Sequence, residues 1–206
     1  MLYAVLHALS KPIFKIFFRL SAYGIENIPK EGGAIIAPNH QSFLDIPIVG
    51  SAMPRKMYTL GKKEFIESKK GGWFYRSMGG IAIDRNSVDL SGLKLSINVL
   101  KQGNLLLLFP EGTRSINGRV GHIRKGAIFL SYKALVPIIP VGLAGTEKAL
   151  PKDARFPKPV HIVVTFGKPI KLWKLFNPEE VSFYDKSAAY IREEIEKCIE
   201  MSRKRL

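Results

Sequence analysis

The amino-acid sequence predicts a single α/β domain whose central sheet is largely parallel or mixed and is flanked by helices. Short β-like segments alternate with helical segments along the chain, an order typical of this class. Residues 105–109 are apolar at every position, as in a central strand that is buried on both faces. The chain of 206 residues is long enough for one sizeable core and too short for two full domains.

The individual elements follow from the spacing of apolar residues and from turn-forming residues between them. Gly103 is expected to end the third of the main helices. Ser187 is expected to cap the last helix. The lone cysteine, Cys198, is expected on the surface of that helix, because charged residues surround it in the sequence. The predicted strands are 33–37, 57–60, 80–83, 104–109, 138–143 and 160–166, and the predicted helices are 46–52, 65–76, 88–102, 124–134 and 187–203.

The first twenty residues have the pattern of a basic amphipathic helix. Large apolar residues recur at three- and four-residue steps, and basic residues form the opposing stripe. Too many charges interrupt this stretch for a membrane span, and the basic residues follow the apolar ones, unlike in a signal peptide. Pro12 is expected to break or kink the helix into two short helices. The apolar residues are Leu2, Val5, Leu6, Leu9, Ile13, Ile16, Phe17 and Leu20, and the basic stripe is His7, Lys11, Lys15 and Arg19.

We therefore predict that residues 1–25 form an amphipathic helical segment that associates with a membrane surface, followed by one globular domain over residues 26–206. Phe14 and Phe18 widen the apolar face, which favours the membrane. The alternative is a helix packed on the protein's own core.

The charge balance points to an anionic partner. Lys and Arg number 32 against 17 acidic residues, a net charge of +15, which suits nucleic acid, anionic lipid or an acidic protein. No nucleic-acid recognition motif is found. Phosphate-loop, dinucleotide-binding and serine nucleophile-elbow motifs are also absent from the sequence. The four scattered histidines and single cysteine make a metal site improbable.

The first candidate catalytic motif runs from Asn39 to Asp45, directly after a predicted strand. In open α/β sheets ligands bind at strand ends, so His40 is well placed for chemistry. His40 and Asp45 meet only if His40 lies on the turn and Asp45 on the first helical turn. The carboxylate then fixes the imidazole tautomer and leaves the other nitrogen as a base. Alternatively, Ser42 and Asp45 form a capping box and His40 is an ordinary turn residue.

A second candidate motif, residues 109–115, also follows an apolar strand. Thr113, Arg114 and Ser115 bring together a guanidinium and two hydroxyls, groups suited to phosphate oxygens. The alternative is a turn closed by a Glu111–Arg114 ion pair. Two further segments are weaker indications of a site. Residues 79–85 end in Asp84 and Arg85, and such an Asp–Arg pair is more often a surface pair. Residues 136–141 suggest an apolar wall.

These four motifs, in this order, resemble those of the glycerolipid acyltransferase family, most closely its lysophosphatidate acyltransferase branch. The His-x-x-x-x-Asp motif matches His40 and Asp45, and Phe-Pro-Glu-Gly-Thr-Arg-Ser matches residues 109–115 without a gap. The Gly-to-Asp-Arg strand end matches 79–85, and Val-Pro-Ile-Ile-Pro-Val matches 136–141. The resemblance covers roughly residues 30 to 146 and identifies 26–206 as an acyltransferase domain.

The resemblance implies a role for each motif. His40 is the general base on the acceptor hydroxyl, and Asp45 orients it. Glu111 and Gly112 shape the site, and Arg114 binds the acceptor phosphate. The remaining substrate-binding candidates are Thr113, Arg85 and Lys62, which lies in a basic stretch between the first two motifs.

The implied reaction moves an acyl group from acyl-acyl carrier protein or acyl-coenzyme A to 1-acyl-glycerol-3-phosphate, forming phosphatidic acid. It requires no metal or redox cofactor, because a thioester is already activated. The expected location is peripheral or monotopic on the cytoplasmic face of the cell membrane, on an anionic lipid surface, with no nucleic-acid partner. Another lysophospholipid, glycerol-3-phosphate or a lyso-ornithine lipid remains open as acceptor. Alternatives of another class are a basic nucleic-acid-binding protein and a membrane scaffold.

Overall fold

The protein folds around one seven-stranded mixed sheet in the order β1-β7-β6-β2-β5-β3-β4. This computed structural model describes residues 2–68, 72–77, 79–84, 89–115, 118–151 and 154–206. Neighbouring strands are parallel except for the β6–β7 pair. The strands are β1 (Ser21–Tyr23), β2 (Ala34–Pro38), β3 (Met57–Lys62), β4 (Gly80–Ile83), β5 (Leu105–Leu107), β6 (Ile138–Ala144) and β7 (Val163–Phe166).

The predicted α/β class and mixed sheet are confirmed, with all six predicted strands present. Strand β1 was not predicted, because three residues are too few to show a period-two pattern. It pairs in parallel with β7 at the edge of the sheet. Residues 21–23, which we assigned to the membrane-associating segment, are therefore part of the sheet.

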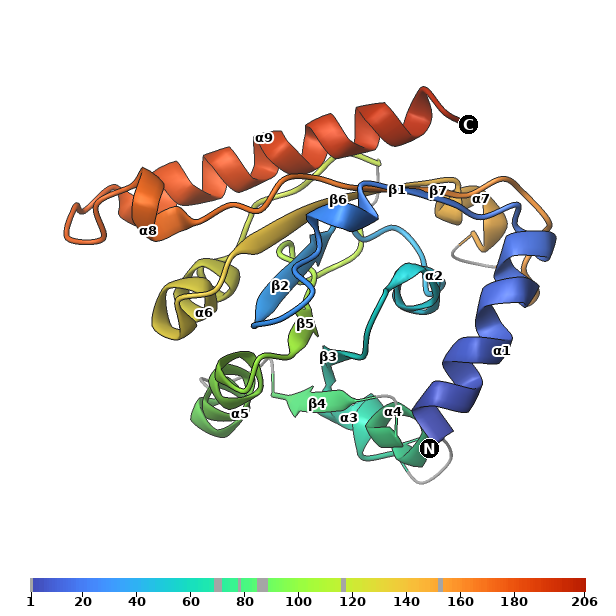
Figure 1. The fold of residues 1–206 in the computed structure, drawn as a ribbon, viewed down its shortest axis with the longest axis horizontal. Coiled ribbons are helices and arrows are strands. Elements are labelled where there is room, and N and C mark those ends of the chain that lie inside the picture. The colour runs from blue at the N-terminus through green and yellow to red at the C-terminus, as the bar shows by residue number, and fades with distance from the viewer. Residues whose placement is uncertain (1, 69–71, 78, 85–88, 116–117, 152–153) are drawn as a thin grey trace.

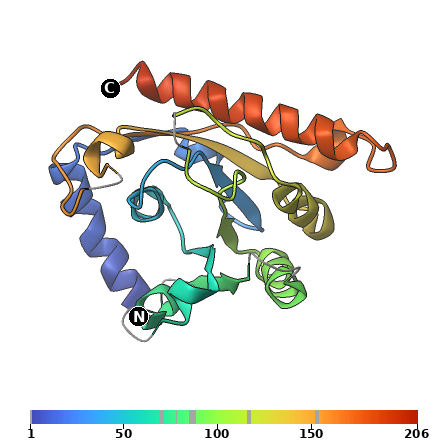
Figure 2. The same cartoon turned by 180° about the vertical axis from the view of Figure 1, so that it is seen from behind.

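Helices cover both faces of the sheet (Figures 1 and 2). The long α9 packs on β6 and β7 and contacts α6, while α1 packs on α2 on the opposite side. The helices are α1 (Leu2–Phe17), α2 (Asp45–Ala52), α3 (Lys63–Ile66), α4 (Gly72–Ser77), α5 (Leu90–Lys101), α6 (Lys125–Ala134), α7 (Thr146–Ala149), α8 (Leu172–Leu175) and α9 (Phe183–Arg203), with a 3-10 turn at Ile25–Asn27.

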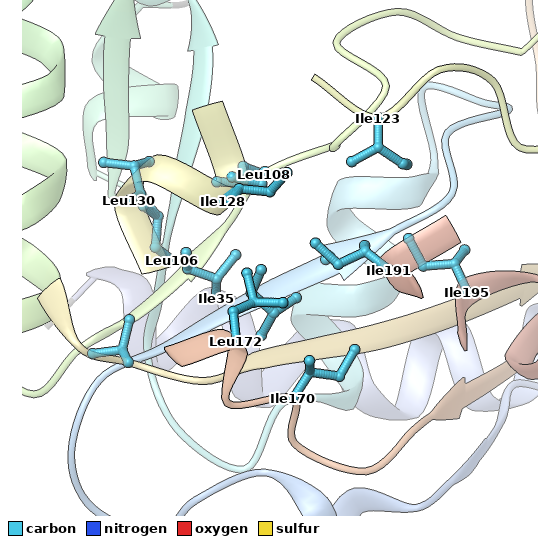
Figure 3. Packing of buried hydrophobic residues seen from close by; sticks show 14 of the residues in the cluster. Ile35, Leu106, Leu108, Ile123, Ile128, Leu130, Ile170, Leu172, Ile191 and Ile195 are labelled. Atoms are coloured by element: carbon cyan, nitrogen blue, oxygen red, sulfur yellow. The ribbon is translucent and has the colours of Figure 1, made fainter. Parts of the chain in front are cut away.

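The core lies in two layers because successive side chains of a strand point to opposite faces. In β2, Ile35 packs with α6, α8 and α9, whereas Ile36 packs with α1 and α2. Figure 3 shows the first layer, where Ile35 and Leu106 meet Leu172 and Ile191. Every residue of β2, β5 and β6 is buried, as the unbroken apolar composition of 105–107 predicts. The segment 136–141 is likewise core.

Three helix predictions are wrong in detail. The predicted helix 65–76 is two short helices, α3 and α4, because the chain folds back at Gly72, where a Cβ would lie 2.3 Å from the Ile66 carbonyl oxygen. Pro12 does not divide α1, which is one helix from Leu2 to Phe17. Ser187 does not cap α9, since the helix begins four residues earlier and buries this serine.

Cys198 is buried against β6, not on a helix surface, and burial raises the pKa of its thiol to about 12. The C-terminal stop at Gly103 is confirmed, since this residue has φ 83° and its amide binds the Leu100 carbonyl at 3.0 Å.

The parallel strands bring the two candidate motifs to one edge. Strands β2 and β5 are hydrogen-bonded neighbours that run in the same direction, so the turns at their carboxyl ends meet. The helices and the rest of the sheet fix the position of this edge.

Candidate active site

His40 and Asp45 form a hydrogen-bonded pair at the carboxyl end of β2. His40 lies on the turn, Asp45 is the first residue of α2, and His40 Nδ1 is 2.7 Å from Asp45 Oδ2. This is the arrangement that the spacing required. The same carboxylate oxygen accepts the backbone amides of Gln41 and Ser42 at 2.7 and 2.8 Å. Asp45 therefore also holds the backbone of the turn that leads into α2. The alternative Ser42–Asp45 capping box is only half formed, because the Ser42 amide donates to Asp45 while no side-chain bond caps α2.

The pair fixes the tautomer of the imidazole. An ionised carboxylate only accepts hydrogen bonds, so Nδ1 carries the hydrogen and Nε2 keeps its lone pair. The His40 ring stacks on Phe109, with centroids 3.6 Å apart and 13° between the planes. Asp45 is fully buried, while 18% of the His40 side chain is exposed. The ring is thus held on two sides and still accessible, as a general base must be.

The turn that carries His40 is anchored to the next strand. Asn39 is buried, accepts the Leu143 amide at 2.7 Å and donates to the Leu143 carbonyl at 3.2 Å. The Ser42 hydroxyl donates to the Leu150 carbonyl at 3.1 Å. These bonds fix the backbone on either side of His40.

Glu111, at the end of β5, connects the two motifs. Its Oε1 accepts the His40 amide at 3.2 Å and its Oε2 accepts the Gly121 amide at 2.7 Å. Burial raises the pKa of the Glu111 carboxyl above its ordinary value, although the two amide bonds act in the opposite direction. Within the described residues no ion pair joins Glu111 to Arg114, so the predicted alternative of an internal pair is wrong.

Arg114 is held by an aromatic ring. Its guanidinium carbon lies 3.9 Å from the centroid of Phe43, which belongs to the His40 turn and is 60% exposed. This cation–π contact fixes the guanidinium beside the His40–Asp45 pair. Thr113, next to it, is exposed.

Arg114 also lines a hollow of about 500 Å³, which we call the cationic hollow. Its basic wall consists of Arg114, Arg119, His122 and Arg124, and Glu111 and Thr113 lie at its side. Such a concentration of guanidinium groups favours a phosphate or carboxylate ligand. The described residues contain no cluster of His, Cys, Asp and Glu that would hold a metal ion.

Comparison with known proteins assigns the family. The model of the acyltransferase family matches residues 19–144, well over half of the chain. The chain belongs to the acyltransferase family. The matched region contains the His40–Asp45 pair, Glu111 and every residue of the cationic hollow.

Individual acyltransferases resemble it over most of its length. It is 36% identical to a chloroplast 1-acyl-sn-glycerol-3-phosphate acyltransferase of Arabidopsis thaliana, over 66% of this chain and 38% of the relative. A 1-acyl-sn-glycerol-3-phosphate acyltransferase of Bacillus subtilis is 27% identical, over 66% of this chain and 67% of the relative. The chain spans half or less of the length of the plant relatives that it matches.

A solved structure shows the same fold. The 1-acyl-sn-glycerophosphate acyltransferase PlsC of Thermotoga maritima superposes with a TM-score of 0.81 at 28% identity, covering 97% of this chain and 78% of that one.

One other predicted site residue among those that the structure describes, Lys62, is not joined to this cluster. Lys62 ends β3, is exposed and pairs in register with Ile83 of β4. It lies at the same edge of the sheet as His40, because β3 and β5 are parallel neighbours. Arg85 lies outside the described residues. Asp84 is described, and its amide donates to Asp89 at 3.0 Å.

Several residues that contact or line this candidate site were not predicted. Phe43 and Arg124 contact the predicted residues directly, and Arg119 and His122 complete the cationic hollow. The excess of basic residues in 119–125 could have indicated an anion-binding segment. Their return to the end of β5 depends on the loop conformation, which spacing does not define.

Proposed function

We propose that this acyltransferase moves a fatty acyl group from a thioester to the sn-2 hydroxyl of 1-acyl-glycerol-3-phosphate, forming phosphatidic acid. The observation that carries the proposal is the His40–Asp45 pair at 2.7 Å beside a hollow with a basic wall. The relatives and the similar structure are named as 1-acyl-glycerol-3-phosphate acyltransferases, which supports the same acceptor.

The chemistry follows from the geometry. His40 Nε2 removes the proton of the acceptor hydroxyl as its oxygen attacks the thioester carbonyl carbon. The tetrahedral intermediate then collapses, the carbon–sulfur bond breaks, and the imidazolium returns the proton to the leaving thiolate. Such a base contributes about 10²- to 10⁴-fold to the rate. The reaction requires neither a metal nor a redox cofactor, because the thioester is already activated.

Arg114 is proposed to anchor the acceptor phosphate next to this base. Positioning converts a bimolecular step into an effectively unimolecular one, which lowers the barrier further. Thr113, Lys62 and Arg85 are proposed as additional phosphate contacts, and Glu111 and Gly112 as residues that shape the site. The donor is proposed to be an acyl-acyl carrier protein or an acyl-coenzyme A, whose acidic groups suit a chain of net charge +15.

The test is phosphatidate formation by the purified protein on lysophosphatidate vesicles, followed with free thiol release for both donors. His40→Ala is expected to lose at least about 10²-fold in kcat. His161→Ala is the matched control, since this histidine bonds with Ser21 and Leu206 and does not line the hollow. Turnover with glycerol-3-phosphate or a lyso-ornithine lipid alone would refute the acceptor. Equal activity of wild type and His40→Ala would refute the mechanism, and no turnover of any acceptor by either protein would favour a scaffold.

We also propose that α1 holds the enzyme on the cytoplasmic face of an anionic membrane as a peripheral or monotopic protein. Ile13, Ile16 and Phe17 are exposed, at 58, 79 and 41%, and Lys11 and Lys15 beside them are exposed too. Such apolar and basic exposure on one helix suits an interfacial position. Phe14 and Phe18 instead pack towards the core, so their assignment to the membrane face is wrong. None of the described helices has the length and apolar composition to cross a bilayer.

The membrane proposal has its own test. Replacing Ile13, Ile16 and Phe17 by serine removes no buried side chain, although the Phe17 ring contacts the buried Phe18 edge-on. The triple variant is expected to lose sedimentation with anionic vesicles. The control replaces Leu175 at the end of α8 and Val181 before α9, which are exposed at 51 and 102%. Unchanged vesicle binding by the triple variant, or salt-sensitive binding to nucleic acid by both variants, would refute the proposal.

A further inference from the structure

Arg124 lines the wall of the cationic hollow, directly before α6. Its backbone amide and its Nε are both engaged in hydrogen bonds within the protein. Its amide donates to the Pro110 carbonyl at 2.9 Å, and its Nε donates to the Glu111 carbonyl at 3.2 Å. Both acceptors belong to the turn that follows β5. The Arg124 side chain therefore lies across the same turn that positions Glu111 and Arg114.

Gly112 makes this arrangement possible. It has φ +73°, and a Cβ there would lie 2.6 Å from Arg124 Nε. Any other residue would displace the guanidinium, so this glycine provides space for Arg124 as well as a left-handed turn.

The terminal nitrogens of Arg124 remain for a ligand. Among the residues that the structure describes, no carboxylate is within ion-pair distance of Arg124. The one acidic residue in the hollow, Glu111, directs both carboxylate oxygens to backbone amides. A guanidinium that is fixed through Nε, on a residue that lines the hollow, has the fork geometry that binds phosphate oxygens.

We propose that Arg124 and Arg114 together clamp the phosphate of the acceptor, and that this clamp selects a phosphate monoester over a phosphate diester. The proposal rests on the proposed function and names the class of acceptor head group. A monoester carries about −1.5 to −2 charge near neutral pH and has three strong acceptor oxygens. Two guanidinium groups therefore match a terminal phosphate, whereas a diester offers one charge and fewer free oxygens.

Arg124→Gln separates binding from structure. Glutamine places its amide nitrogen the same number of bonds from the backbone as Arg Nε. It therefore retains a donor to the Glu111 carbonyl while it removes the charge and both Nη groups. Arg124→Leu removes the structural bond as well. Lys125→Gln is the matched control, because it removes the same charge from the adjacent residue, whose ammonium lies 5.4 Å from the Tyr184 ring and not in the hollow.

The experiment measures kcat and KM with lysophosphatidate and with lysophosphatidylglycerol, a diester. Arg124→Gln is expected to raise KM for lysophosphatidate about 10- to 100-fold, the effect of losing one charged hydrogen-bonding group, and to change kcat by less than about threefold. The preference for monoester over diester should fall by the same factor. Lys125→Gln should match the wild type.

A second readout needs no turnover. Glycerol-3-phosphate is expected to raise the Tm of the wild type and of Lys125→Gln, and to raise that of Arg124→Gln much less. If the wild type acylates no acceptor but shows this difference, the proposed function fails and the anion clamp stands.

Three outcomes would overturn the clamp. If Arg124→Gln matches the wild type while Arg124→Leu is inactive, Arg124 only supports the turn. A fall in kcat without a change in KM would assign Arg124 to the chemical step. Equal losses with monoester and diester would remove the claim of selection.

Discussion

Asp45→Asn is the most informative single change, because it separates the two tasks of one carboxylate. Oδ2 of Asp45 accepts from His40 Nδ1 and from the amides of Gln41 and Ser42. Asparagine still accepts at a helix start, so α2 is retained. The negative charge that orients and stabilises the imidazolium is lost.

The magnitudes of the two effects differ. Each charge-assisted bond is about 1 kcal/mol stronger than its neutral counterpart, and the new amide group replaces Oδ1, which is buried without a partner among the described residues. The expected loss of stability is about 2 to 4 kcal/mol, or roughly 5 to 15 °C in Tm for a chain of this size. The expected loss in kcat is about 10²- to 10⁴-fold, equivalent to about 2.7 to 5.4 kcal/mol of barrier.

The assay pairs thermal unfolding with steady-state kinetics at a temperature where both proteins are folded. Asp185→Asn is the control, since it removes the same charge from the first turn of α9, away from any described histidine pair. We expect Asp185→Asn to keep full activity. If Asp45→Asn is folded and loses less than about tenfold in kcat, the carboxylate serves the helix start alone and the reasoning on the tautomer is refuted.

Three further predictions concern Glu111, Phe43 and Gly142. The raised pKa of Glu111 means that the folded state binds this proton more tightly than the unfolded state does. Stability relative to Glu111→Gln should therefore decline as the pH rises above about 4.5, the ordinary value, as urea denaturation will show; a constant difference would contradict this. Phe43→Leu should raise KM for lysophosphatidate about two- to fivefold and leave kcat unchanged, while Phe43→Tyr retains the cation–π contact and the wild-type KM. Gly142→Ala places a Cβ 2.1 Å from the α9 backbone and should cost about 3 kcal/mol in unfolding experiments, whereas Gly126→Ala, with nothing within 4 Å, should not destabilise.

Much of the fold could be predicted because its elements carry clear local patterns. The central strands are unbroken apolar runs, and α5 ends at a glycine in the left-handed conformation. The errors arose where tertiary contacts override local preference. Pro12 is tolerated within α1. Cys198 lies in a run of charged residues, yet its position on α9 faces β6, and the distant Gly142 allows the close approach.

The site was predictable to the extent that each residue belongs to a motif next to a strand end. His40, Asp45, Glu111 and Arg114 come together because β2 and β5 are neighbours, and the resemblance to the acyltransferase motifs implied a shared site for them. The contacts of Phe43 and Arg124 are different in kind. The Arg124 contact depends on how the chain after residue 115 returns to the turn, and the Phe43 contact depends on how the His40 turn lies against the turn after β5. No spacing rule defines either of these.

The junction between α1 and the sheet has a mechanical consequence. Phe18 is 2% exposed, the Phe18 carbonyl accepts the Ile162 amide, and the Ser21 amide donates to the Ile162 carbonyl, both at 3.0 Å. The helix is thus connected to β1 by a short segment whose backbone is hydrogen-bonded to residue 162. It also packs on α2, which begins with Asp45. A helix so mounted would set both the height and the tilt of the reactive imidazole above the lipid plane. Acceptors would then have to rise to a fixed level, and a flexible insertion between residues 20 and 21 would uncouple lipid binding from turnover.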